Sequence, residues 1–135
     1  MALVTWDESY SVNVKSCDAQ HQKLFSLINS LHEAMKLGRG RQVVGRIVDE
    51  LERYTQTHFS AEEALMERAQ YCGLEEHCTQ HRHFESRVAQ FKKDLDEGAA
   101  GDSISVLTFL KDWLATHILR TDRMYSEELN AHGIN

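Results

Sequence analysis

The sequence contains no proline, no cluster of basic residues and no long hydrophobic segment. A proline inside a helix costs about 3 kcal/mol, so a chain of 135 residues without one favours long, uninterrupted helices. The apolar runs are only a few residues long, far short of the roughly 20 that span a bilayer, so no membrane segment is expected. A net charge of −6 without a basic cluster argues against nucleic acid as a partner.

Cysteine is scarce, and its spacing shows no recognised motif. Cys17, Cys72 and Cys78 form neither a CxxC pair nor a zinc-ribbon spacing, and we expect reduced thiols. A redox-sensitive pair of Cys72 and Cys78 remains an alternative. The N-terminus has no basic stretch followed by an apolar run, so we expect no signal peptide and a cytoplasmic protein.

Glycines divide the chain into segments with helical periodicity. The breaks fall at 38–40, near 73 and at 98–101, and we interpret residues 1–135 as a single domain. Between the breaks, apolar residues recur at i, i+3, i+4 and i+7. This pattern predicts helices over 18–37, 41–67, 74–97 and from 102 or 103 onward, with Asp18 capping the first and Asp102 or Ser103 the fourth.

Short connections between four helices predict antiparallel neighbours. The expected fold is therefore all-α, an up-down-up-down antiparallel four-helix bundle over residues 18–131. Residues 1–17 do not show the helical period. We interpret them as an N-terminal extended arm that Trp6 and Tyr10 anchor on the bundle.

Eight histidines are the unusual feature of the composition, and five of them continue the apolar faces of the predicted helices. A single inward histidine is more commonly a hydrogen-bonded core residue than a metal ligand. In an antiparallel bundle, however, the start of helix one, the end of helix two and the start of helix three lie at the same end. At about 1.5 Å per residue, the residues at these three places fall close to one level: His21, His58, Glu62, His77 and His81. His117 lies in the middle of the fourth predicted helix, so that helix should extend beyond the site at its C-terminal end.

Burying so many imidazoles and carboxylates would be costly without compensation, which a metal could supply. Imidazole and carboxylate together suit iron, zinc, nickel or copper. Five histidines with Glu62 and Asp122 exceed what one ion needs, whereas two ions that share both carboxylates would use all seven. Asp122 is five residues after His117 and would point about 140° round an α-helix from it, so spacing alone leaves its role open.

The combination of motifs resembles the bacterial hemerythrin domains of the hemerythrin family over nearly the whole chain. The matching stretches are Trp6…Tyr10-x-Val12, Asp18-x-Gln20-His21-x-x-Leu24-Phe25, His58-Phe59-x-x-Glu62-Glu63-x-Leu65-Met66, His77-x-x-x-His81-x-x-Phe84 and Trp113-Leu114-x-x-His117-Ile118-x-x-x-Asp122-x-x-Tyr125. One departure is Asn13, where the family often has glycine; we expect it to affect a turn and not the site.

The resemblance implies a non-haem diiron centre that binds dioxygen reversibly. By position, His77, His81 and His117 would hold one iron, and His21 and His58 the other, which keeps a vacant position for dioxygen. Glu62 and Asp122, with an oxo or hydroxo group, would bridge the two irons. The resemblance also implies a dry, apolar pocket beside the vacant position, lined by Phe59, Trp113, Leu114 and Ile118, although each of the four also suits plain core packing.

The leading hypothesis is a dioxygen-binding module for sensing, storage or delivery and not an enzyme; as a sensory domain, for example of a chemotaxis receptor, it would need a larger parent chain. The alternative is a diiron oxidase or peroxidase or a nitric-oxide-reactive enzyme, and a third is a structural or metal-storage bundle. No histidine follows a glutamate by three residues, which disfavours ferritin-like oxidases. The HExxH motif of zinc metallopeptidases is also absent.

Overall fold

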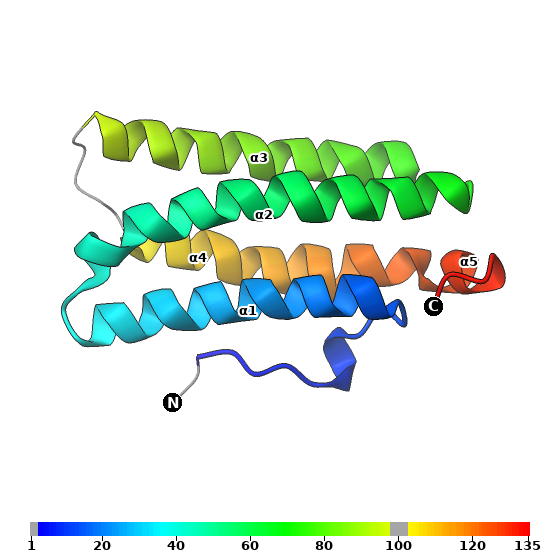
Figure 1. The fold of residues 1–135 in the computed structure, drawn as a ribbon, viewed down its shortest axis with the longest axis horizontal. Helices are drawn as coiled ribbons and strands as arrows, with labels where there is room; N and C mark the ends of the chain where they lie inside the picture. Colours follow the sequence, from blue (N-terminus) through cyan, green and yellow to red (C-terminus); the bar gives the residue numbers. More distant parts are fainter. Residues whose placement is uncertain (1–2, 98–102) are drawn as a thin grey trace.

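The computed structural model describes residues 3–97 and 103–135, and it is built from four long helical rods. The first three are α1 (Lys15–Lys36), α2 (Gly40–Arg68) and α3 (Leu74–Asp96). The fourth begins as α4 (Ser103–Trp113) and continues through η2 (Leu114–Thr121), η3 (Asp122–Tyr125) and α5 (Ser126–Ala131). Successive rods run in opposite directions (Figure 1), which confirms the predicted all-α bundle. No strand occurs within the described ranges.

The core forms where the apolar faces of the four rods meet. Side chains recurring at helical spacing are fully or almost fully buried there; among them are Leu24, Ile28, Leu31, Ile47, Leu51, Phe84, Val88 and Leu110. A second, smaller apolar cluster lies at the other side of the histidines and contains Val12, Val14, Cys17, Met66, Tyr125 and Leu129. The histidine-rich level is therefore enclosed by apolar packing along the bundle axis on both sides.

The N-terminal arm lies along α1 (Figure 1), as the sequence predicted, but it is not extended throughout, because it contains the 3-10 turn η1 (Glu8–Tyr10). The rings of Trp6 and Tyr10 both pack on Phe25, with centroids 5.4 and 4.7 Å from it. The side chain of Asn29 accepts hydrogen bonds from the backbone N–H groups of Leu3 and Val4 and donates one to the Val4 carbonyl. These contacts give the arm one defined position on the first helix.

The start of the first helix differs from the prediction. The helix begins at Lys15, and Asp18 lies within its first turn instead of preceding it. The Asp18 carboxylate accepts hydrogen bonds from the Val12 N–H at 2.9 Å and the Ser11 hydroxyl at 2.6 Å. Asn13, the residue after Val12, has a left-handed backbone with φ 58°. Glycine adopts this conformation freely and asparagine tolerates it. Asn13 therefore lies in a turn, as we expected of a position at which the family often has glycine.

The connections fall where the glycines predicted them, within the described ranges. Gly38 has φ 71° and separates α1 from α2, while Gly73 immediately precedes α3. The predicted break at 98–101 and a cap at Asp102 lie outside the described residues. The fourth rod, expected as one α-helix, instead changes to a π-helix at Leu114 and to a 3-10 turn at Asp122.

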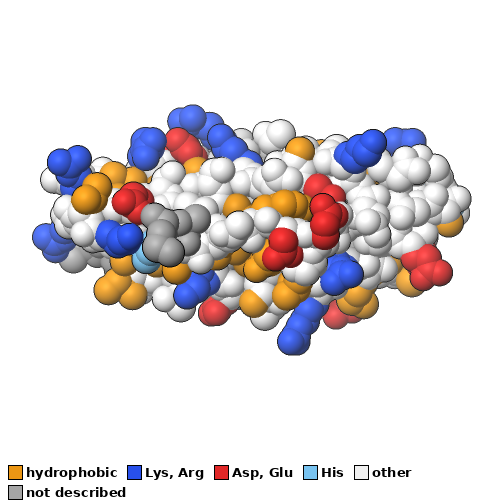
Figure 2. Space-filling view, turned by 90° about the horizontal axis from the view of Figure 1, so that it is seen from below, with side chains coloured by type: hydrophobic (Ala, Val, Ile, Leu, Met, Phe, Trp, Pro, Cys, Tyr) orange, Lys and Arg blue, Asp and Glu red, His pale blue; other side chains and the backbone are white. Residues whose placement is uncertain are grey.

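The outer surface carries charges of both signs. Figure 2 shows one face, on which basic and acidic side chains are interspersed and hydrophobic side chains reach the surface between them. None of the helices in the described part of the chain is both long and apolar enough to cross a bilayer.

Candidate metal centre

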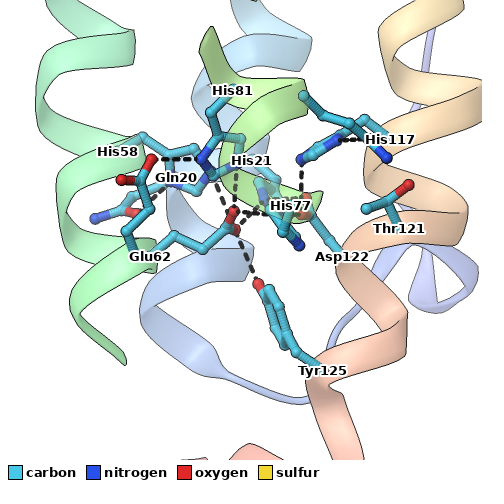
Figure 3. Close-up of polar contacts among 12 residues, drawn as sticks. Gln20, His21, His58, Glu62, His77, His81, His117, Thr121, Asp122 and Tyr125 are labelled. Carbon is cyan, nitrogen blue, oxygen red and sulfur yellow. Dashed lines mark hydrogen bonds and ion pairs between the residues drawn. The ribbon is translucent and has the colours of Figure 1, made fainter. Parts of the chain in front are cut away.

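The bundle brings all seven predicted site residues to one level (Figure 3). His21 comes from α1, His58 and Glu62 from α2, His77 and His81 from α3, and His117 and Asp122 from the π and 3-10 turns of the fourth rod. Every one of them is at most 2% exposed. Their ligand-type atoms form two groups, each with all atoms within 4.8 Å of one another: His77, His81, His117, Glu62 and Asp122 in one, and His21, His58 and Glu62 in the other.

Glu62 faces both groups, one with each carboxylate oxygen. Its Oε1 lies 3.0 Å from Nε2 of His77 and 3.0 Å from Nε2 of His81. Its Oε2 lies 3.4 Å from Nε2 of His21 and of His58. A carboxylate that presents one oxygen to each of two histidine groups has the arrangement of a bridging ligand.

Asp122 repeats this arrangement from the opposite side. Its Oδ1 lies 2.8 Å from Nε2 of His77 and 2.9 Å from Nε2 of His117, and its Oδ2 lies 3.1 Å from Nε2 of His21. Neither oxygen has a hydrogen-bond partner of good geometry among the described residues. Each of the two buried carboxylates thus presents one oxygen to each of the two histidine groups.

The π-helix explains how Asp122 reaches the site. In an α-helix a residue five positions after His117 would point well away from it. Here the backbone N–H of Asp122 bonds to the carbonyl of His117, the i→i+5 pattern that defines a π-turn. The wider turn places residue i+5 near the face of residue i, so both side chains enter the site. The i+4 residue, Thr121, instead bonds through its hydroxyl to the Thr116 carbonyl.

Three histidines are held from outside by polar side chains of a neighbouring helix. The Nδ1–H of His58 donates to Oε1 of Gln20, and that of His117 to Oε1 of Gln80 at 2.7 Å. The Nδ1–H of His81 donates to the Glu63 carboxylate at 2.7 Å. Because a carboxylate or amide oxygen accepts at Nδ1, each ring keeps its Nε2 lone pair for the site.

Sequence reasoning assigned no role to these three partners. Each stands beside a site residue in the sequence, as the pairs 20 and 21, 62 and 63, and 80 and 81 show. Adjacent positions on a helix point about 100° apart, so a residue beside an inward histidine can reach the next helix. A polar residue next to each inward residue was therefore the signal that could have found them.

The carboxylates dominate the protonation of the site. Burial lowers the pKa of His21 and of His77, but the close carboxylates of Asp122 and Glu62 outweigh it and raise the two pKa values to about 10 and about 9. Burial opposes ionisation of Glu62 as well, yet its interactions with His58, His21 and His77 hold its pKa well below the ordinary value. Without a metal, protons on imidazole would have to supply the positive charge that these carboxylates need.

Two tyrosines lie at the site, and one of them bonds to it. The hydroxyl of Tyr125, which is fully buried, donates to Oε2 of Glu62 at 2.9 Å. Burial, together with the charges of Glu62 and Asp122, raises the pKa of Tyr125 well above 10, so the phenol keeps its proton. Tyr54 stacks on His58 with ring centroids 5.1 Å apart, and its buried hydroxyl has no partner among the described residues.

The four residues expected to line an apolar pocket are all buried at this level. Phe59 stacks on the ring of His81 at 3.8 Å, and Trp113 on the ring of His117 at 3.9 Å. Leu114 and Ile118 are 3% and 1% exposed in the same core. Aromatic and aliphatic groups therefore surround the histidine rings on the side away from Tyr125.

A protein-family model described as the hemerythrin HHE cation binding domain matches residues 12–129. The chain belongs to the hemerythrin family. It is 35% identical to a bacteriohemerythrin of Stenotrophomonas maltophilia, over 98% of this chain and 85% of that protein. It is 32% identical to a bacteriohemerythrin of Methylococcus capsulatus, over 97% of this chain and the whole of that protein.

Two further relatives extend the comparison. A myohemerythrin of Phascolopsis gouldii is 30% identical, with 92% of each chain covered. A crystal structure of wild-type hemerythrin superposes with a TM-score of 0.85 at 31% identity, covering 95% of this chain and 98% of that one. The family and the all-α fold are thus established by sequence and by structure together.

The chemistry of the donor atoms in this chain fits a metal. Nε2 of His21, of His81 and of His117 are buried without a hydrogen-bond partner among the described residues, and they face carboxylate oxygens. An imidazole nitrogen that faces a carboxylate oxygen needs a proton or a metal cation between the two atoms, and a metal would satisfy all three contacts at once. Imidazole and carboxylate ligands without thiolate suit iron and its neighbours in the first transition row.

Proposed function

We propose that this protein binds dioxygen reversibly at a diiron centre. His77, His81 and His117 would hold one iron and His21 and His58 the other, while Glu62 and Asp122 bridge the pair. When bound, the two irons would supply a vacant coordination position and the electrons that hold dioxygen there. The observation that carries the proposal is that each of the two carboxylates directs one oxygen to each histidine group.

The unequal number of histidines supports binding at one iron. The group of three histidines with two carboxylate oxygens offers five ligand atoms, and the group of two histidines with two carboxylate oxygens offers four. With a shared bridging oxygen, the second group would retain a free position. Its histidines come from α1 and α2, so we place the dioxygen site on that side of the bundle.

The surroundings favour holding dioxygen over reducing it further. Complete reduction needs protons from outside, and a dry pocket withholds them. Phe59, Trp113, Leu114 and Ile118 supply apolar surface around the site. The Tyr125 hydroxyl is already engaged with Glu62, and its raised pKa keeps the proton on the phenol.

The test is to load the protein with ferrous iron without oxygen, add dioxygen and follow the visible spectrum. We expect a charge-transfer band that persists and that disappears again when dioxygen is removed under vacuum. Rapid conversion to the ferric spectrum with release of hydrogen peroxide would instead favour an oxidase. A protein that takes up no iron pair would contradict both functions.

Sensing, storage and delivery share this chemistry and differ in how the cell uses the bound dioxygen. We propose dioxygen binding as the common step for all three, including a sensory role within a larger receptor. A change in protease sensitivity or in amide exchange between the oxygen-free and oxygenated forms would favour sensing. Identical exchange in the two forms would favour storage or delivery.

A further inference from the structure

A surface groove of about 370 Å³ lies between α1 and α2, beside the group of two histidines. Its walls include Gln20 and Lys23 from α1 and Arg53 and Tyr54 from α2, and His58 forms part of its lining. The groove thus borders the outer edge of His58, a residue that we place in the metal centre. Nothing in the proposed dioxygen chemistry uses this groove.

Two cations at the groove have no partner. Lys23 and Arg53 are exposed, and neither forms an ion pair with any residue in the described part of the chain. The one acidic side chain in the lining, Glu50, lies 3.9 Å from Arg46 outside the groove. In a protein with a net charge of −6, two free cations at one hollow make it a local site of positive potential.

The lining also offers a neutral donor. Gln20 uses its amide oxygen to accept from His58, so its NH₂ group faces no acceptor among the described residues. The hydroxyl of Tyr54 is buried in the protein, so only the ring of this residue borders the groove. The NH₂ group of Gln20 is therefore the neutral donor that a bound ligand could use.

Much of the groove surface is nevertheless apolar. The ring of Tyr54, stacked on His58 at an angle of 22°, and the aliphatic stems of Lys23 and Arg53 supply it. A ligand that satisfies both features has an acidic group for the cations and an apolar body for the aromatic wall. A volume near 370 Å³ is within the range of small-molecule sites.

We propose that this groove binds a small organic carboxylate with an apolar body. The carboxylate lies between Lys23 and Arg53, and the body lies against Tyr54. Binding itself does not depend on the metal centre. Because Gln20 holds His58, occupancy of the groove changes the Gln20–His58 hydrogen bond and so reaches the two-histidine group; this coupling alone rests on the proposed function.

The test uses the folded protein loaded with redox-inert zinc and three probes: benzoate, neutral benzamide of the same shape, and inorganic phosphate. Two-dimensional amide NMR follows each titration. We expect benzoate to shift the amides of the groove residues and the ring signal of His58, with benzamide and phosphate at least about tenfold weaker. That ratio corresponds to the loss of one or two partly exposed ion pairs, or of the apolar contact.

Two double variants that each remove two positive charges test the role of the groove cations. Lys23→Gln with Arg53→Gln should weaken benzoate binding about tenfold, whereas Lys111→Gln with Arg41→Gln, which removes two exposed cations away from the groove, should leave it unchanged. Equal binding of benzoate and benzamide, equal binding of phosphate, or equal loss in both double variants would overturn the proposal. If benzoate binds the groove but the His58 ring signal does not move, the coupling is wrong and the binding site stands.

Discussion

Glu63 differs from the two glutamines that hold neighbouring histidines, because it carries a charge. A carboxylate that accepts the Nδ1–H of a ligating histidine raises the basicity of the opposite ring nitrogen, more than a neutral amide does. Arg82 also donates a hydrogen bond to Oε2 of Glu63. His81 should therefore bind a metal more strongly than His58 or His117, the other two histidines whose Nδ1–H groups bond to a neighbouring helix.

We expect Glu63→Gln to weaken zinc binding about tenfold to a hundredfold and to raise the reduction potential of the iron-loaded protein. Gln80→Glu is the converse change at His117 and should shift both quantities in the opposite direction. Calorimetry and redox titration measure the two effects. Arg82→Gln controls for the lost surface ion pair and should change zinc affinity little. Shifts of the same sign in Glu63→Gln and Gln80→Glu would refute the charge argument.

Ile118 tests the apolar pocket. Replacing this buried side chain by glutamate places a ligand and proton donor among apolar neighbours, so Ile118→Glu should shorten the life of the oxygenated form. Ile118→Leu keeps the volume and should preserve it. Stopped-flow absorbance measures the decay, and circular dichroism checks that the helices remain. If Ile118→Glu decays at the wild-type rate, Ile118 does not line the pocket.

At the scale of single residues, the sequence predicts the features that follow from helical periodicity. The inward positions of His21, His58 and Glu62 follow from apolar spacing alone, and the structure does bring them together. The bond from Tyr125 to Glu62 does not follow from the sequence, because spacing places the ring at the site but does not direct its hydroxyl. The partners Gln20 and Gln80 depend on how two helices are rotated against each other, which no single helix reveals.

Among the elements, the π-turn of the fourth rod decides the geometry of Asp122. Periodicity assumes 3.6 residues per turn throughout, and on that assumption Asp122 is misplaced and Thr121 is in position. The i→i+5 bond to His117 reverses their roles. No local residue preference marks a π-turn, so the sequence could not predict it, and π-turns are frequent at functional sites.

Moving the acid by one residue tests this element directly. We expect Thr121→Asp combined with Asp122→Ala to lose metal as fully as Asp122→Ala alone, because position 121 points away from the site in a π-turn. Metal per chain is measured by elemental analysis after loading with ferrous iron or zinc. Thr121→Asp alone is the control and should load normally. Recovery of both ions by the double variant would show that the segment is α-helical in solution.

At the scale of the whole molecule, the site and the fold share one pH dependence. His21 and His77 have pKa values raised from 6.5 to about 10 and about 9 in the ion-free protein. The stability they contribute is fully present below pH 6.5, the unfolded value, and is lost as pH rises through the folded values. A metal reverses this trend, because it competes with protons for the same nitrogens and binds better as pH rises.

Thermal unfolding from pH 6.5 to pH 9 should therefore separate the two forms. We expect the midpoint of the ion-free protein to fall over this range and the gap between zinc-loaded and ion-free protein to widen. A variant with His77→Gln should lose much of the decline in the ion-free form. An ion-free midpoint that rises over the same range would contradict the protonation of these histidines.

The ligand positions are spread over nearly the entire chain, from His21 on the first rod to Asp122 on the last. A folding chain cannot assemble this constellation until α1 and the π-turn have already docked, so ions would join after the rate-limiting step. Bound metal would then leave the folding rate almost unchanged and slow unfolding instead. The metal centre would therefore contribute little to the rate at which the bundle forms and much to the lifetime of the folded molecule.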